Sequence, residues 1–512
     1  MALVLATRLP SRSEHLFSWD SVNFALGMER IDVAEHEPHP PGYIGYIAAA
    51  RALRLGASEN AALLRLNIAA AALSALIVWC FAMRVTESWR GATAAWSLVV
   101  TSPLHWFYSG VAEIYAVELL VTLSIAWAAY ECIHSPRTRA WPWLLGGAVA
   151  TALLCKLPAA VLMAPLVLYA TIQARPLARA AMMAACSVGV VGALIAIGSV
   201  TSPEVLWQLS ARQAEGVGAT SVLGGFGLRA LNQSARDFSY ACMAAAGAGG
   251  LVAIPLRRRA GSYFPTLFVT IWTVPYIVLC LFVHFPKPGY ALPLVAPLAL
   301  WLGSGFVSAP GIRTVVTIAV MIALNAAHFV GAQPWSAEQT GGPLRYRDRS
   351  MAQKLRTELN SIMRPSLSTI RQHDSVVRWF LDATVATCSD TSRVVLVSAG
   401  GAVTWRHAMF YIPEAPVVRL PTPQDGVLIA QHHAMQPMAT GDIDLRGGCI
   451  IFVGGGGLDD VDLGANRERL REVVFGEEKL SWARAPLEMR LLPGGRKLSV
   501  RAEDPNAATV AR

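Results

Sequence analysis

The chain has 512 residues, of which 54% are hydrophobic and only 15% are charged, which is too apolar for an ordinary soluble enzyme. A formal net charge of +9 suggests nucleic acid as the partner of a soluble protein. Here, however, the arginines form short clusters between apolar runs, as cytoplasmic membrane anchors do. The composition therefore predicts a membrane protein whose partners include membrane lipids and no nucleic acid.

The chain begins with the apolar segment Met1–Leu5, which is far too short to cross a bilayer. No basic region precedes it, as one would in a signal peptide. We interpret Ala2–Leu9 as the outer end of a first span whose start codon lies upstream. A polar loop over about residues 14–60 follows it.

Ten apolar runs come after this loop, and a helical crossing needs about 20 residues. The runs are 61–83, 91–104, 112–131, 143–157, 158–171, 180–200, 238–256, 263–283, 290–307 and 312–331. The two short runs that meet at Lys156 and Pro158 could be tilted, kinked or partly re-entrant. The pattern predicts an all-α polytopic membrane domain over residues 1–331 with about 10–11 transmembrane helices.

Lysine and arginine in short loops mark the cytoplasmic side of a membrane protein. Here they occupy every second connection, at residues 84–90, 137–139, 175–179, 257–259 and 313. The connections predicted to lie outside the cytoplasm are 14–60, 102–111, 156–158, 201–237, 284–289 and everything after 331. This alternation requires Lys156 to lie near the outer surface of an inner (plasma) membrane.

After residue 331 the sequence becomes polar, with strand-like runs at 393–398, 417–420, 427–430 and 449–453 and a helical pattern at 352–363. These runs predict a small soluble α/β domain over residues 332–512, placed outside the cytoplasm. In that compartment a disulfide between Cys388 and Cys449 is allowed, and a free buried pair is the equal alternative.

The first outer loop contains the side chains best suited to chemistry. Asp20 follows the interpreted first span, and the prolines of the turn His39-Pro-Pro-Gly-Tyr43 fix the backbone. On the residues alone, a solvated interfacial loop is favoured over an active site. A divalent metal bound by His36, Glu37 and His39 is less favoured than loop-stabilising hydrogen bonds, because prolines flank His39. No cofactor is assigned.

This loop resembles the first periplasmic loop of the GT-C glycosyltransferases, the polytopic class that includes protein O-mannosyltransferases and bacterial aminoarabinose transferases. In that class an acidic residue of this loop acts at the reaction centre, and the resemblance assigns that place to Asp20. The common Asp-Glu pair of the class is Asp20-Ser21 here, so a second carboxylate at position 21 does not carry over.

Three further segments are similar to the same class, and together the four cover most of the first 330 residues. Glu113 and Tyr115 lie in a segment similar to the second outer loop, where the class often has Asp. Lys156 resembles a lysine near an outer helix end. Lys287 and Tyr290 belong to a segment that resembles the basic-Tyr-Leu-Pro sequence before a late span.

The resemblance implies a polyprenyl-phosphate-linked sugar donor and a lipid, glycan or protein acceptor. Such a site needs cations for the phosphate, and the resemblance offers Lys156 and Lys287. Arg65 is a third candidate, for which snorkelling to the interface is favoured. Asp20 would act as general base in a single inverting displacement, and Glu113 would orient the acceptor. The remaining substrate-binding candidates are His36, His39, Tyr43, Tyr115 and Tyr290.

Two other classes of protein remain open. A transporter or lipid flippase tends to have internal repeats and ionisable residues near the bilayer midplane. Here the charged residues gather at the outer helix ends and no clear repeat is present. A non-catalytic sensor would bind its ligand through residues 332–512, far from the acidic and proline-rich first loop. The enzyme is therefore the favoured interpretation, although fold-level resemblance fixes neither sugar nor acceptor.

Overall fold

The computed structural model describes most of the chain. The described residues are 1–40, 42–135, 140–202, 204–205, 207–208, 211, 227–256, 266–283, 287–307, 309–336, 338–341, 348–387, 393–397, 403–419, 428–437, 442–443, 449–453, 461–462, 471–475, 478–484, 487–491 and 498–502.

The chain forms two compact units, and each of them contains segments that are far apart in the sequence. The first unit comprises Met1–Ser13, Ile31–Ala34 and His39–Arg371, and the second comprises Glu14–Arg30, Glu35–Pro38 and Gln372–Arg512. The first loop is therefore divided between the two units. The placement of residues 332–512 outside the cytoplasm stays a prediction.

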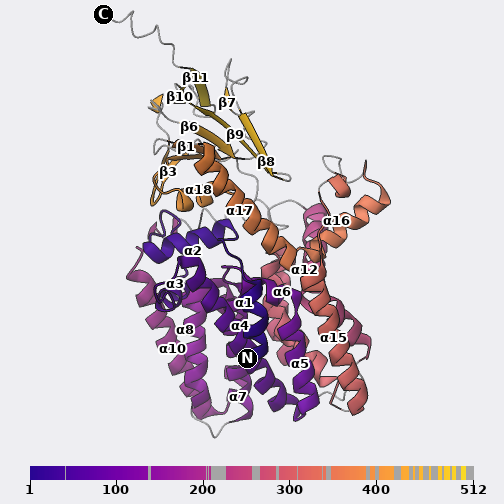
Figure 1. Ribbon diagram of the computed structural model, residues 1–512. Coiled ribbons are helices and arrows are strands. Elements are labelled where there is room, and N and C mark those ends of the chain that lie inside the picture. Colours follow the sequence, from indigo (N-terminus) through magenta and orange to yellow (C-terminus); the bar gives the residue numbers. More distant parts are fainter. Residues whose placement is uncertain are drawn as a thin grey trace, which may run out of the picture. The chain divides into compact units, whose positions relative to one another are not determined.

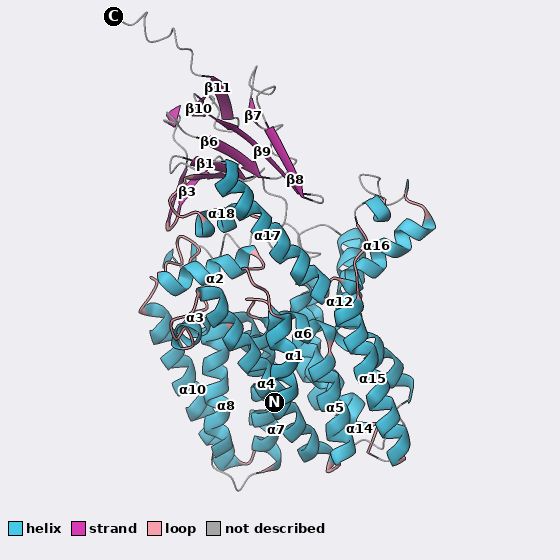
Figure 2. Ribbon diagram, viewed as in Figure 1, coloured by secondary structure: helices cyan, strands magenta, loops and turns pink. Residues whose placement is uncertain are grey.

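The first unit consists of helices (Figures 1 and 2). They are α1 (Ala2–Ser11), α3 (Ile44–Ala52), α4 (Glu59–Thr86), α5 (Trp89–Thr101), α6 (Pro103–Gly110), α7 (Tyr115–His134), α8 (Ala140–Cys155), α9 (Leu157–Gln173), α10 (Pro176–Gly198), α12 (Gly227–Leu256), α13 (Thr266–Val278), η2 (Leu279–Val283), η3 (Pro288–Leu294), α14 (Val295–Ser304), α15 (Gly311–Gly331), η4 (Glu338–Thr340) and α16 (Met351–Met363). Each predicted apolar run contains a helix, and α16 matches the helix predicted at 352–363.

Six helices within the described residues are long and apolar enough to cross a membrane: α4, α7, α10, Leu231–Pro255 of α12, α13 continued by η2, and α15. The predicted run 91–104 is instead broken, because α5 ends at Thr101 and α6 begins at Pro103. The two short runs form the apolar helices α8 and α9, which Lys156 separates.

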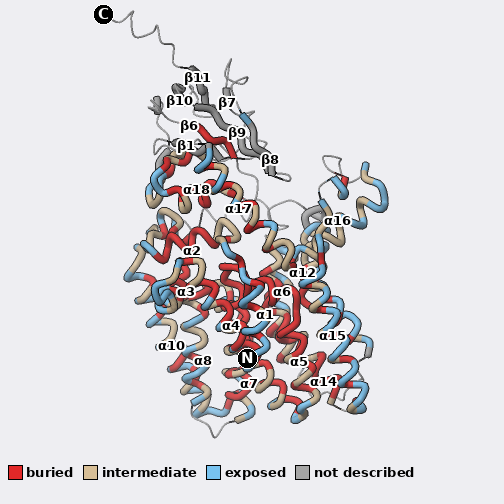
Figure 3. Tube along the Cα trace, in the orientation of Figure 1, coloured by how far each residue is buried: buried red, intermediate tan, exposed pale blue. Residues whose placement is uncertain are grey.

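The burial of side chains identifies the inside and the lipid-facing side of this unit (Figure 3). Most side chains of α7 are buried, and α7 packs against α4, α8 and α9. In contrast, α10 exposes Val188, Val191 and Leu194, and α15 exposes Ile312 and Val315. Rows of exposed aliphatic side chains are rare on soluble monomers and are suited to lipid. The protein is therefore a multi-pass membrane protein.

The connections that carry arginine meet one another, as the charge alternation predicts for one side of a membrane. Arg84, in the last turn of α4, lies with its Nε 3.1 Å from Oε1 of Glu131 near the end of α7. Arg90, at the start of α5, donates to the carbonyl of Ala309 just before α15, at 3.0 Å. Side-chain contacts thus join connections that the sequence assigned to the same side.

The helix α12 is broken at Gly247, whose φ of 65° is outside helical geometry. The side chain of Asn325 on α15 satisfies backbone groups beside the break. Its Oδ1 accepts from the Gly249 N–H at 2.7 Å, and its Nδ2 donates to the Ala246 carbonyl at 3.2 Å. A buried amide thereby replaces hydrogen bonds that the helix lacks at the break.

The second unit contains α2 (Trp19–Glu29), most of α17 (Leu367–Thr387), α18 (Trp405–Tyr411) and two sheets. The strands are β1 (Arg393–Val397), β2 (Val417–Arg419), β3 (Leu428–Gln431), β4 (Ala434–Pro437), β5 (Asp442–Ile443), β6 (Cys449–Val453), β7 (Val461–Asp462), β8 (Arg471–Phe475), β9 (Glu478–Arg484), β10 (Leu487–Leu491) and β11 (Leu498–Ala502). One sheet has the order β4-β3-β2-β1-β6-β9-β8 and the other β5-β10-β11-β7.

The larger sheet confirms the small α/β domain expected from the sequence. Its central strand β1 runs parallel to β2 and β6, and the remaining pairs are antiparallel. All side chains of β6 are buried, which explains its unbroken apolar sequence. Cys449 at the start of β6 is disulfide-bonded, whereas Cys388 lies outside the described residues.

The first loop is held to α17 and α18 by buried polar contacts within the second unit. The Tyr411 hydroxyl accepts from the Leu16 N–H at 2.9 Å, and Nε2 of His407 lies 3.0 Å from the Leu16 carbonyl. Burial lowers the pKa of His407 to about 3, so its ring is neutral at pH 7. Because the Thr404 N–H donates to Nδ1, Nε2 carries the proton given to Leu16.

Candidate functional site

Lys156 occupies the single-residue break between α8 and α9, and its side chain is only 3% exposed. Its Nζ lies 5.5, 4.9 and 5.0 Å from the ring centres of Tyr43, Tyr115 and Tyr290. The same atom is 3.9 Å from Oε2 of Glu118 on α7. Electrostatic attraction between an ammonium and an anion is stronger where water is excluded. This cation is therefore suited to bind an anionic group.

A second ion pair lies at the start of α7. Nζ of Lys287 is 3.0 Å from Oε1 of Glu113, with side-chain exposures of 31% and 3%. The backbone of Glu113 is fixed from α4, because Nδ2 of Asn67 donates to the carbonyls of Val111 and Glu113, each at 2.7 Å. The carboxylate is thus buried and held in place, while the lysine reaches partly into solvent.

The segment Lys287-Pro-Gly-Tyr290 brings Lys287 and Tyr290 to the start of α7. The Gly289 N–H donates to the Tyr108 hydroxyl at 3.0 Å. The Tyr115 ring lies so close to Gly289 that a Cβ there would have no room. This close approach places Tyr290 with its ring 5.6 Å from that of Tyr115. Glycine is therefore required at position 289 for the tyrosine cluster to form.

A polar cavity of about 180 Å³ adjoins Lys287. It is lined by Asp237, Tyr240, Ala241, Lys287, Pro288, Ser361 and Arg364. The Tyr240 hydroxyl donates to the Glu358 carboxylate, and Nη1 of Arg236 is 3.6 Å from the same carboxylate. The cavity thus has two cations, Lys287 and Arg364, and acidic groups beside them.

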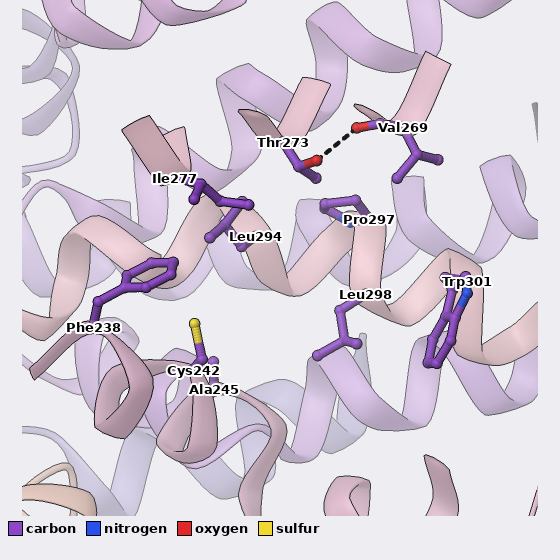
Figure 4. Close-up of a pocket in the computed structure, with 10 residues that line it drawn as sticks. All are labelled: Phe238, Cys242, Ala245, Val269, Thr273, Ile277, Leu294, Pro297, Leu298 and Trp301. Carbon is purple, nitrogen blue, oxygen red and sulfur yellow. Dashed lines mark hydrogen bonds between the residues drawn. The ribbon is translucent and has the colours of Figure 1, made fainter. Parts of the chain in front are cut away.

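An apolar cavity of about 390 Å³ lies between α12, α13, η3 and α14 (Figure 4). It is lined by Phe238, Cys242, Ala245, Val269, Thr273, Ile277, Leu294, Pro297, Leu298 and Trp301. Two elements line both cavities. The helix α12 contributes Asp237 to the polar cavity and Cys242 to the apolar one, and η3 contributes Pro288 to the polar cavity and Leu294 to the apolar one. A polar cavity beside an apolar one suits an amphiphile with an anionic head and an apolar chain.

Asp20 and His36 lie in the second unit. Asp20 is in the first turn of α2, which Ser18 caps, and negative charge is stabilising at that end of a helix. The His36 ring centre is 6.1 Å from that of Trp19. Burial, together with the nearby Arg406 guanidinium, lowers the pKa of His36 to about 4, so the ring is neutral at pH 7.

Two other predicted residues have local roles in the first unit. Nη1 of Arg65 donates to the carbonyls of Leu53 and Arg54 at 3.0 and 2.8 Å, which caps the end of α3. The ring of His39 packs against Tyr43, with centres 4.7 Å apart. The structure thus brings together Tyr43, Tyr115, Lys156 and Tyr290, with Glu113 and Lys287 as a neighbouring pair.

The metal group considered at His36, Glu37 and His39 is divided between the units, with His39 in the first. Glu37 instead forms a hydrogen bond, which is the alternative that the sequence favoured over a metal. Its Oε2 accepts from Nδ1 of His433 at 2.8 Å. Burial raises the pKa of Glu37, and its bond with His433 opposes that rise.

Sequence reasoning missed Glu118, Tyr108 and Asn67. A signal existed for Glu118, since an ionisable residue inside an apolar run is a functional candidate by default. Asn67 gave a weaker signal of the same kind, as an amide within the run 61–83. For Tyr108 no sequence signal was available, because its hydroxyl is used only once η3 is in place.

Known proteins provide an independent comparison. Residues 38–207 match the family model described as dolichyl-phosphate-mannose-protein mannosyltransferase. The matched region includes Tyr43, Glu113 and Lys156. No curated protein sequence matches the chain significantly.

Solved structures extend this comparison to nearly the whole chain. The structure is similar to that of ArnT from Cupriavidus metallidurans bound to undecaprenyl phosphate, with a TM-score of 0.56 and 13% identity over 95% of this chain and 97% of that one. The apo state of ArnT gives a TM-score of 0.53 and 13% identity over 94% and 96%. The chain therefore has the membrane fold of the GT-C glycosyltransferases, the class that its loop motifs resemble.

Proposed function

We propose that the chain is a membrane glycosyltransferase that moves a sugar from a polyprenyl-phosphate donor to an acceptor outside the cytoplasm. The observation that carries this proposal is the pair of cavities that α12 and η3 both line, a polar one at Lys287 and an apolar one beside it. Polyprenyl phosphate has the matching parts, a phosphate and an apolar chain. ArnT, which has this fold, was solved with undecaprenyl phosphate bound.

The two lysines are the proposed phosphate ligands. Lys156 is shielded from water by tyrosine rings, so its charge acts strongly on a phosphate that enters the cluster. Lys287 reaches into the polar cavity. Cations at this place bind the donor and stabilise the negative charge that the phosphate gains as it leaves the sugar. Tyr43, Tyr290 and His39 would form the wall around the donor head.

The proposed reaction is one inverting displacement at the anomeric carbon. The acceptor hydroxyl or amine attacks that carbon, the bond from the carbon to the phosphate oxygen breaks, and the phosphate keeps the electron pair. Asp20 takes the acceptor proton, a role that rests on the resemblance of its loop. Glu113 orients the acceptor, for which its burial and fixed backbone are suited.

The proposed location is the inner (plasma) membrane, with the second unit outside the cytoplasm. The alternation of arginine-bearing connections supports this orientation. The disulfide at Cys449 supports it too, because disulfides persist in oxidising compartments and are rare in the cytosol.

Transfer from a labelled donor pool tests the proposed activity. Membranes that contain the chain should move radiolabelled sugar from polyprenyl phosphate to a new product, and matched membranes without the chain should not. Loss of label from the donor is the readout, because it does not require knowledge of the acceptor. Absence of transfer across several donors and acceptor extracts would contradict the enzyme and favour the transporter.

The apolar cavity provides a second prediction, on donor chain length. Ala245→Phe should fill part of this cavity and raise the KM for a long-chain donor about tenfold, because each lost CH₂ contact is worth about 0.8 kcal/mol. A donor analogue with a short chain should be affected little. Val252→Phe, on the exposed side of α12, is the matched control. Equal changes for both donors would argue against a polyprenyl chain in this cavity.

A further inference from the structure

A group of side chains of the types that bind metals lies within the second unit, apart from the residues of the proposed reaction. Glu29 ends α2, and His432 and His433 form the turn between β3 and β4. Oε2 of Glu29 is 3.0 Å from Nε2 of each histidine. In the part of the chain that the structure describes, this is the single group of three or more His, Cys, Asp or Glu whose ligand atoms all lie within 4.8 Å of one another.

Glu37 fixes the orientation of one of these histidines. Nδ1 of His433 is 2.8 Å from Oε2 of Glu37, a carboxylate that is fully buried. The guanidinium of Arg30 supports both groups, since it donates to the His433 carbonyl at 2.7 Å and lies 3.4 Å from Glu37. A carboxylate that accepts from the second ring nitrogen is the usual partner of a metal-bound histidine.

This orientation leaves an electrostatic problem that a cation would solve. If Nδ1 of His433 carries the proton given to Glu37, then Nε2 presents a lone pair to the Glu29 carboxylate only 3.0 Å away. Two acceptors at this distance repel each other. Either an additional proton or a shared cation must lie between them.

The spacing of the ligand atoms fits a shared metal ion. Zn²⁺ binds imidazole nitrogen at about 2.0–2.1 Å, which places tetrahedral ligand atoms about 3.3 Å apart. The two distances from Glu29 to the histidines are within a few tenths of an ångström of that spacing. Imidazole ligands favour zinc and its neighbours in the transition series over Mg²⁺ and Ca²⁺.

We propose that Glu29, His432 and His433 bind one divalent transition metal ion of the Zn²⁺ type, with a water as fourth ligand and Glu37 as the hydrogen-bonding partner of His433. Asp20 lies in the first turn of α2, and Glu29 is at its other end. The ion would thus tie the helix that carries Asp20 to the β3–β4 hairpin of the same unit. It stabilises the position of α2 and takes no part in bond breaking.

Zinc binding to the full chain tests the site directly. The protein, purified in detergent with a tag that contains no histidine and stripped by a chelator, is titrated with Zn²⁺ and analysed for metal content. Wild type should bind one equivalent, and Co²⁺ at the same site should give the visible absorption of a tetrahedral complex. Zinc should also raise the Tm of wild type.

Variants identify the ligands. Glu37→Gln should weaken zinc binding about 10- to 100-fold, as is typical for the partner of a ligating histidine. His433→Gln and His432→Gln should weaken it further and abolish the zinc-dependent rise in Tm. His15→Gln, in the same unit but outside the group, should bind zinc as wild type does.

Two results would overturn the proposal: unsaturable binding with no defined stoichiometry, or equal affinity in wild type and His433→Gln. Since the three ligands are partly exposed, the variants should fold, which equal Tm values without metal would verify. Glu29→Gln provides a second route if either histidine variant is unstable. Zinc binding is measured without reference to transfer, so its outcome does not depend on the proposed reaction.

Discussion

Asp20→Asn should reduce the rate of sugar transfer about 10²- to 10⁴-fold, which is the usual contribution of a general base. Asn has nearly the same shape as Asp and is tolerated near a helix start, so α2 and its Ser18 cap should remain. The measurement is the initial rate of transfer from labelled donor in membranes with expression matched by blotting.

The same substitution elsewhere in the first loop is the control. The Asp32 carboxylate accepts from the Ala34 N–H at 3.1 Å, a local turn contact. Asp32→Asn should therefore transfer sugar at close to the wild-type rate. Full activity in Asp20→Asn would remove Asp20 as the base and turn attention to Glu113, the other predicted catalytic carboxylate.

We expect the second large effect on transfer from the substitution Lys156→Met. A hydrogen bond to a charged group is worth about 1.5–3 kcal/mol, so loss of the lysine's contact with phosphate should lower kcat/KM about 10- to 150-fold. The effect should appear with every polyprenyl-phosphate donor, because the phosphate is common to all of them. Rates at several donor concentrations would separate weaker donor binding from slower transfer.

A double variant separates this role from a structural one. Removal of Lys156 alone leaves the buried Glu118 without its cation, at a cost of about 3–5 kcal/mol. Lys156→Met combined with Glu118→Gln removes both charges and should restore the Tm. Transfer should remain low in the double variant. Recovery of transfer together with stability would mean that Lys156 only supports the fold.

The apolar helices could be predicted because hydropathy is a local property of the sequence. Every predicted run contains a helix, and strands β1, β2, β3 and β6 lie where alternation and β-branched residues indicated them. In contrast, α17 was missed, because its mixture of polar and apolar residues gives no apolar run. The charge alternation grouped Lys156 with the connections 14–60 and 284–289, and its ammonium lies near Tyr43 of the first and Tyr290 just after the second.

Contacts between distant segments could not be predicted in this way. Glu29 and His433 are about four hundred residues apart, and no local pattern relates the end of α2 to a hairpin turn. The division of the first loop between two units was equally hidden. It depends on buried groups such as His407, whose partner Leu16 has no distinguishing feature in the sequence. Motifs indicated the residues of the site, and packing determined their neighbours.

The cluster at the start of α7 is completed late in protein synthesis. Lys287 and Tyr290 are translated roughly 130 residues after Lys156, on the order of ten seconds at about 5–20 residues per second. During that interval, Glu113 is already in the nascent bundle without the lysine that faces it in the finished one. A chain that stops before this segment keeps the Glu113 carboxylate buried without Lys287. Its folded state is therefore less stable than that of the complete chain. We therefore expect the quality-control proteases of the membrane to degrade prematurely terminated chains much faster than complete ones.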